Sequence, residues 1–131
     1  MTKTFYEREI ERIEKDVLLS RHLYVQVRQS KAFMERNYAE QIDAKKMAAA
    51  ASMSRFHYIR IFRSIYGVTP RRYLRDLRMA KAKKMLANNR SVTDVCFDVG
   101  YESLPTFSSA FKRATGFSPK RYQTLCCGNL E

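Results

Sequence analysis

The most distinctive chemical feature of this sequence is its excess of lysine and arginine. They number 25, against 13 aspartate and glutamate residues, which gives a formal net charge of +12. Residues 1–46 hold ten basic and eight acidic side chains, whereas residues 47–131 hold fifteen and five. Ammonium and guanidinium groups neutralise phosphates, and a segregated basic excess is typical of nucleic-acid binding. We therefore expect a polyanion to meet residues 47–131, with a merely solvated basic surface as the alternative.

Other chemistries find little support. The three cysteines and two histidines lack metal-ligand spacing, so we expect no metal and no other cofactor. Cys96 falls where a small core residue is expected, and Cys126 and Cys127 have no evident base or pocket to activate a thiol. We expect no enzyme, and a thiol-based redox or alkylation sensor is a minor alternative.

The sequence also bears on compartment and fold class. No apolar run approaches the ~20 residues that a membrane-spanning helix needs. Charges alternate at the start of the chain, where a signal peptide would be apolar. These features predict a cytoplasmic protein without a membrane partner. Only four glycines and three prolines are available for turns, which favours helices over a many-stranded sheet.

Capping residues outline a pair of short helices over residues 44–66. Asp43 is a suitable N-cap for an alanine-rich helix and Ser54 for the next, which Gly67 ends. Two short helices joined by a tight turn form a helix-turn-helix.

A longer linker helix is expected over residues 70–88. Thr69 and Pro70 stand in the order preferred at a helix start, and such a helix would span about 27 Å. Its basic residues form a stripe that is either a solvated face or a track for phosphates: Arg71, Arg75, Arg78 and Lys81.

An internal repeat determines the predicted architecture. FRSIYGVTPRRY (62–73) matches FKRATGFSPKRY (111–122) at a constant offset. The second copy has one extra residue in its turn, where Gly100 is placed for a positive φ. The repeat predicts an all-α fold in which a second helix-turn-helix, over residues 92–116, follows the linker helix.

Two such units suggest how one chain would bind double-stranded DNA. The second helix of a helix-turn-helix enters the major groove, and grooves on one face of the duplex repeat every ~34 Å. These recognition helices are expected at about 54–66 and 103–115. The linker helix would place them in adjacent major grooves, so that one chain reads a long asymmetric site.

Residues 1–27 are predicted to form an N-terminal helical extension. Apolar residues recur there at heptad-like spacing between alternating charges. These residues are Tyr6, Ile10, Ile13, Val17, Tyr24 and Val27. Ser20 interrupts the seam, which leaves two alternatives: a homodimer contact through residues 6–27, or packing on the same domain or on a missing neighbour. Residues 30–38 show a second helical pattern.

Residues 28–125 closely resemble the C-terminal DNA-binding domain of AraC/XylS-type bacterial transcription regulators. The motifs of the family stand here in order as Ala48, Met53, Ser54, Phe62, Arg63, Gly67, Thr69, Pro70, Tyr73, Leu74, Arg78, Met79, Ala82, Met85, Leu86, Gly100, Tyr101, Phe107, Phe111, Lys112, Gly116, Ser118, Pro119 and Tyr122. The resemblance implies a homeodomain-like domain of seven helices over residues 28–126. It also implies a sequence-specific regulator of transcription, such as an activator, that acts on RNA polymerase at promoters. Such a protein would be associated with the nucleoid.

The resemblance also implies which side chains meet DNA. Base contacts are expected from Arg55, Phe56, Ile59, Arg60, Leu104, Pro105, Ser108 and Ser109. Phosphate contacts are expected from Arg63, Arg71, Arg72, Thr106, Lys112, Arg113, Lys120 and Arg121. Arg60 is the foremost candidate because a guanidinium pairs bidentately with guanine, whereas Arg55 is also placed to meet phosphate. Ser109 stands where many relatives carry arginine, so we expect the second recognition helix to discriminate less.

Two alternatives stay open on sequence alone. A sequence-tolerant architectural DNA-binding protein would use the same charge without reading bases.

Family members usually carry a separate sensor domain, for which residues 1–27 are too short. The chain is therefore either a stand-alone regulator or a fragment, and its initial methionine favours the former.

Overall fold

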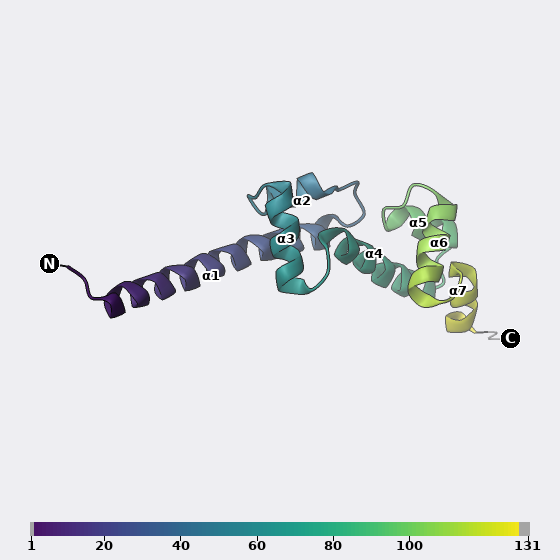
Figure 1. Ribbon diagram of the computed structural model, residues 1–131. Helices are drawn as coiled ribbons and strands as arrows, with labels where there is room; N and C mark the ends of the chain where they lie inside the picture. Colours follow the sequence, from purple (N-terminus) through teal and green to yellow (C-terminus); the bar gives the residue numbers. More distant parts are fainter. Residues whose placement is uncertain (1, 129–131) are drawn as a thin grey trace.

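The computed structural model describes residues 2–128, which form seven helices and no strand. Met1, the first residue of the predicted extension, lies outside this range. The helices are α1 (Phe5–Asn37), α2 (Ala44–Ala50), α3 (Arg55–Tyr66), α4 (Pro70–Ala87), α5 (Val92–Asp98), α6 (Leu104–Thr115) and α7 (Pro119–Cys127). Two lobes lie at either end of α4, and α1 projects beyond the first of them (Figure 1). The predicted all-α fold with two helix-turn-helix units and a linker helix is confirmed.

The two lobes repeat one pattern of aromatic packing, as the sequence repeat predicts. In the first lobe the rings of Phe62 and Tyr73 meet at 5.7 Å with an interplanar angle of 70°. In the second lobe the rings of Phe111 and Tyr122 meet at 5.3 Å and 77°. Phe62 and Phe111 are both fully buried, and each sits in a separate apolar core. Each recognition helix is therefore held by its own lobe.

Polar side chains set where most helices begin. Asp43, Thr69, Ser91, Ser103 and Ser118 each precede a helix and accept a hydrogen bond from a backbone N–H of its first turn. Such caps satisfy donors that have no partner within the helix. They fix the rotational register of α6, and thus decide which of its residues face outward.

The start of α3 differs in detail from this scheme. Ser54 occupies the N-cap position, as predicted, but its side chain makes no capping hydrogen bond. The register of α3 therefore depends on its buried residues, Tyr58 and Phe62, and on Gly67, which ends the helix in the left-handed conformation.

The N-terminal region corrects one expectation. Residues 5–27 and 30–38 were expected as separate helices, yet a single helix of 33 residues, α1, covers nearly both. No residue between them breaks a helix, and the Ser30 hydroxyl donates to the Val27 carbonyl at 2.6 Å, so its polarity is satisfied within the helix. The domain division at residue 27 stays a prediction, but no helix ends there. None of the helices in residues 2–128 is long and apolar enough to cross a membrane.

The second half of α1 belongs to the first lobe. Val27, Ser30 and Met34 are fully buried there. The Tyr58 hydroxyl donates to Ser30 Oγ at 2.9 Å and ties α3 to α1. Burial raises the pKa of Tyr58 to about 12, so this hydroxyl keeps its proton, and remains a donor, even at alkaline pH. Val27 was expected in the heptad seam of the extension, and its burial in this core removes it from that seam.

Candidate nucleic-acid interface

The first recognition helix, α3, presents polar and aromatic side chains outward from its N-terminal half. Arg55 and Arg60 are exposed, and Phe56 is 73% exposed although it is a large apolar residue. The Arg55 guanidinium lies 4.9 Å from the centre of the Phe56 ring. Ile59 is half-buried and packs partly against the first core. An exposed aromatic ring between two arginines matches the surface expected of a helix that enters a groove.

The second recognition helix, α6, has a smaller and uncharged outer face over its N-terminal half. Leu104, Pro105 and Ser109 are exposed, and Ser108 is half-buried. Thr106 is exposed but locally engaged, because its hydroxyl oxygen accepts a hydrogen bond from the Ser103 hydroxyl at 2.7 Å. This face offers methyl and hydroxyl groups where α3 offers guanidinium groups.

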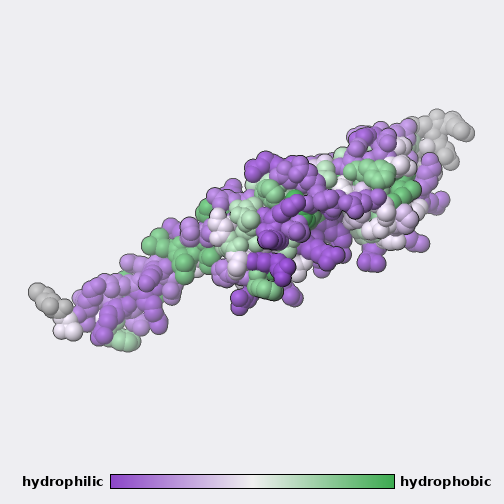
Figure 2. Space-filling model, turned by 90° about the horizontal axis from the view of Figure 1, so that it is seen from above, coloured by the Kyte–Doolittle hydropathy of each residue, from purple (hydrophilic) through white to green (hydrophobic). Residues whose placement is uncertain are grey.

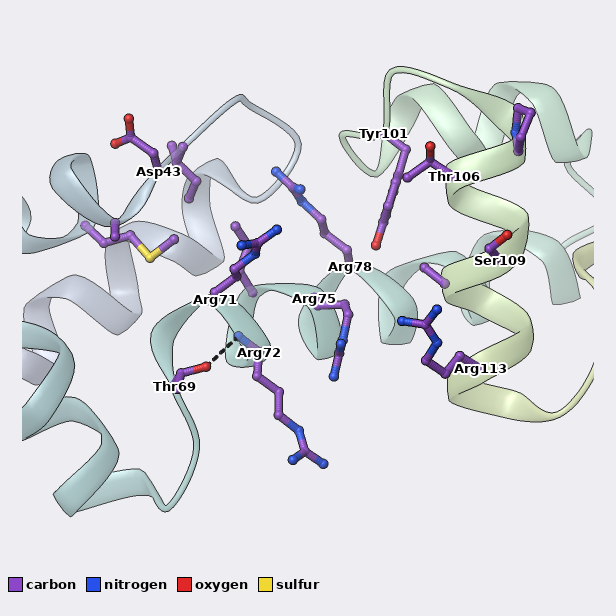
Figure 3. Close-up of a pocket in the computed structure, with 16 residues that line it drawn as sticks. Asp43, Thr69, Arg71, Arg72, Arg75, Arg78, Tyr101, Thr106, Ser109 and Arg113 are labelled. Carbon is purple, nitrogen blue, oxygen red and sulfur yellow. Dashed lines mark hydrogen bonds between the residues drawn. The ribbon is translucent and has the colours of Figure 1, made fainter.

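A groove of about 960 Å³ separates the two lobes. Its lining comes from the start of α2, from α4 and from α6, and Figure 3 shows these elements around it. Five arginines take part: Arg71, Arg72, Arg75, Arg78 and Arg113. Asp43 is the one acidic residue of the lining, so a positive field fills the groove.

The groove brings together four of the predicted phosphate contacts, Arg71, Arg72, Thr106 and Arg113. It also includes Arg75, which belongs to the basic stripe of the linker helix but is not among the predicted phosphate contacts. Arg75 is exposed, and Figure 3 shows Arg113 extending from α6 toward α4.

The other four predicted phosphate contacts lie outside the groove lining. Arg63 and Lys112 are exposed in the last turns of α3 and α6. Lys120 and Arg121 are exposed in the first turn of α7. A cation near a helix C-terminus also favours the helix dipole, so Arg63 and Lys112 contribute locally in any case.

Few of the basic side chains after residue 46 are neutralised within the described chain. The ion pairs found there are Arg72 and Arg75 with Asp76, both at 3.9 Å, and Arg90 with Asp98. Exposed pairs at such distances are weak. The guanidinium groups of Arg55, Arg60 and Arg113 therefore remain available to an anionic partner.

Two of the cysteines, Cys96 and Cys127, are engaged within the protein. Cys96 is fully buried in the second core, and burial raises the pKa of its thiol, which disfavours the reactive thiolate. Cys127 Sγ lies 3.6 Å from the carbonyl oxygens of Leu86 and Ala87. Within residues 2–128 no group of three or more metal-ligating side chains comes together.

Two helix-turn-helix lobes on a shared linker helix, with an arginine-lined groove between them, define the class of double helix-turn-helix DNA-binding domains. Comparison with known proteins narrows this class. The family model described as "Helix-turn-helix domain" matches residues 47–124, more than half of the chain. The chain belongs to the AraC/XylS family of helix-turn-helix transcription regulators.

Individual relatives agree with this assignment. The bifunctional transcriptional activator/DNA repair enzyme AdaA of Bacillus subtilis is 29% identical over 94 residues, 71% of this chain and 44% of that protein. The transcriptional activator RhaS of Escherichia coli is 33% identical over 90 residues, 68% of this chain and 32% of that protein. The DNA-binding domain of the global transcriptional factor AdpA, solved with a target DNA, is 31% identical. Its TM-score is 0.73, and the match covers 76% of this chain and 90% of that one. The chain thus spans less than half the length of these two curated relatives.

Proposed function

We propose that this chain binds double-stranded DNA sequence-specifically and regulates transcription at promoters of the bacterial nucleoid. The observation that carries the proposal is the pair of outward faces on α3 and α6, together with the arginine-lined groove that α4 and α6 border. The AdpA domain, similar in fold and sequence, was solved on a target DNA, which supports the same use here.

In this proposal the two recognition helices have unequal roles. Arg55, Phe56, Ile59 and Arg60 of α3 carry most base discrimination, because α3 supplies the guanidinium groups. Leu104, Pro105, Ser108 and Ser109 of α6 touch thymine methyls or sense shape. The groove and the basic residues around it hold the phosphates between and beside the two contacts.

Selection of binding sites from random duplex DNA at physiological salt tests this function. A bipartite site about two helical turns long is expected, with stronger base preference in one half. Salt-sensitive binding to every duplex without enrichment would overturn the proposal and favour a sequence-tolerant architectural role.

The phosphate contacts lead to a prediction about salt. Arg113→Ala is expected to lower affinity for all duplexes alike, because a phosphate contact carries no base information. The slope of log affinity against log salt concentration should fall in magnitude by about 0.9. Titrations at several salt concentrations measure it. Arg90→Ala is the matched control, because Arg90 already pairs with Asp98 and should leave the slope unchanged. An unchanged slope in Arg113→Ala would remove this residue from the DNA contact.

Regulation further requires a contact with the transcription machinery. We propose that the chain, when bound to DNA, contacts RNA polymerase. The activator role of RhaS, a member of the same family, supports this step. Transcription in vitro from a promoter that carries the selected site, with and without the protein, tests this step and gives the sign of regulation. A transcript level that does not change with the protein would overturn it.

We also propose that the projecting half of α1 pairs with a second copy of the chain. Ile10, Ile13, Val17 and Tyr24 are 37–56% exposed and share the heptad spacing of a helical seam. Glu7, Glu14 and Arg21 flank that seam and offer charges of both signs to a partner helix. Apolar residues gather on this projecting segment where it nears the first lobe (Figure 2).

Dimerisation predicts a change in sedimentation. Val17→Glu places a charge in the seam and is expected to convert a dimer to a monomer at micromolar concentration, because a buried unpaired carboxylate is costly. Lys15→Glu, on the opposite face of α1, is the control and should leave the dimer intact. The proposal would be contradicted if the unaltered chain sedimented as a monomer at all concentrations in sedimentation equilibrium.

A further inference from the structure

The connection between α1 and α2 lies between the two lobes. Tyr38, at the end of α1, packs against the core of the first lobe and also against the core of the second. Extensive helix packing in the described residues otherwise stays within each lobe or runs along α4. Residues 38–41, here called the bridge, therefore supply a contact between lobes that the linker helix alone does not.

Arg78 fastens the bridge to α4. Its Nε donates to the Tyr38 carbonyl at 2.7 Å and its Nη2 donates to the Glu40 carbonyl at 2.8 Å. Its guanidinium lies 5.8 Å from the centre of the Tyr101 ring, which belongs to the second lobe. Figure 3 shows Arg78 and Tyr101 side by side between the lobes. Unlike its exposed neighbours Arg71 and Arg75, Arg78 is half-buried and uses its donors within the protein.

The second lobe meets the bridge through its turn. Gln41 Nε2 donates to the Gly100 carbonyl at 2.9 Å. A Cβ at Gly100 would lie 3.0 Å from the carbonyl oxygens of both Tyr38 and Ala39, and 3.1 Å from Arg78 Cζ. Gly100 also has a φ of +99°, which side-chain-bearing residues rarely adopt. The close approach of bridge and turn thus requires glycine for two independent reasons.

We infer that the bridge, Arg78 and Gly100 form a clamp that fixes the angle between the lobes, with Arg78 as its positioning residue. When two binding modules are rigidly linked, the gain in affinity from binding both targets is concentrated at one separation of those targets. A mobile link distributes the same gain over many separations. For the part that concerns DNA, the inference rests on the proposed function. The clamp would then set the spacing at which two half-sites are read together.

Arg78→Lys separates this role from a simple charge contact. Lysine keeps the positive charge in the groove but lacks the planar fork that reaches two carbonyls at once. If Arg78 only attracted phosphate, the lysine variant would behave like the unaltered chain. Gln41→Ala is a milder second variant, because it removes one hydrogen bond from an exposed side chain. Arg90→Lys is the control, since Arg90 makes no contact with the bridge.

A DNA-free measurement tests the clamp itself. Spin labels at Ser64→Cys on α3 and Ala114→Cys on α6 report the distance between lobes, with Cys126→Ser and Cys127→Ser to prevent stray labelling; Cys96 is buried. We expect one narrow distance distribution in the parent chain and in Arg90→Lys, and a broader one in Arg78→Lys and Gln41→Ala. Thermal unfolding and far-ultraviolet circular dichroism confirm that each variant is folded. Equally narrow distributions in all folded variants would overturn the inference.

Affinity measurements on DNA test whether the clamp sets the spacing of the two half-sites. On duplexes with both half-sites, Arg78→Lys should lose about tenfold in affinity, and on a single half-site less than about twofold. Site selection with this variant should enrich several half-site spacings instead of one. Equal losses on both kinds of duplex would overturn the positioning role. If the parent chain selects no bipartite site, the proposed function fails, while the spin-label result still decides on the clamp.

Discussion

Phe62→Ala is expected to lower the free energy of unfolding by about 3–5 kcal/mol, a typical cost for deleting a buried phenylalanine ring. Phe62 is fully buried, and its ring contacts those of Tyr58, Tyr66 and Tyr73 at centroid distances of 4.7–5.7 Å. Because domains of this size are stable by only about 5–15 kcal/mol, much of the total stability depends on this residue. Urea unfolding followed by circular dichroism measures the change.

Phe56→Ala on the same helix is the matched control. Phe56 is 73% exposed, so its removal should change stability by less than about 0.5 kcal/mol. Its expected effect is instead on DNA binding, where it is proposed to contact bases. The pair thus separates a phenylalanine that holds α3 in place from one that α3 presents. Similar losses of stability in both variants would contradict the assignment of inner and outer faces to α3.

The fold could be predicted because each of its main signals is local. N-cap residues and terminal glycines mark helix ends within a few positions, and the repeat then transfers each assignment from one lobe to the other. Gly100 was expected to take a positive φ and has a φ of +99°. The same position in the first lobe gave no such signal, although Ser52 there has a φ of +56°.

The predictions at α1 were less complete, for a physical reason. A heptad seam shows that a helix face will be covered, but it does not show by what. Val27 continues the apolar spacing of Ile13 and Val17, yet the first lobe covers Val27 and leaves the other two exposed. The end of the seam depends on where α3 packs, which is set by tertiary contacts such as Tyr58 with Ser30.

In the candidate site too, some features could be predicted from the sequence, whereas others depend on tertiary contacts. The outward residues of α3 and α6 were predicted from the family resemblance, because each position of the family motif corresponds to one residue of this sequence. The groove and the clamp depend on partners 38–59 positions apart, such as Arg78 with Glu40 and Gln41 with Gly100. No local pattern links such residues, and Arg78 read on its own looks like one more member of a basic stripe. Only the fold shows that its donors point inward.

Arg60→Ala is expected to cost about 1–3 kcal/mol of binding free energy on the selected site, the value of one bidentate contact to a base. Arg60 is exposed on α3 and has no ion-pair partner among the described residues, so its guanidinium is free to pair with guanine. Affinity for unrelated duplexes should fall far less, because a base contact adds little to non-specific binding. Titration of selected and scrambled duplexes at one salt concentration measures both.

Two comparisons make the Arg60 prediction specific. His57→Ala, an exposed neighbour on α3, should leave both affinities nearly unchanged. Ser109→Ala, at the corresponding site of α6, should cost less than Arg60→Ala, because a hydroxyl supplies no bidentate guanidinium contact. If Arg60→Ala weakened selected and scrambled duplexes equally, Arg60 would be a phosphate contact, and specificity would have to come from Phe56 and Ile59 or from DNA shape. The asymmetry between α3 and α6 therefore predicts an operator whose two halves differ in how strictly their bases are read.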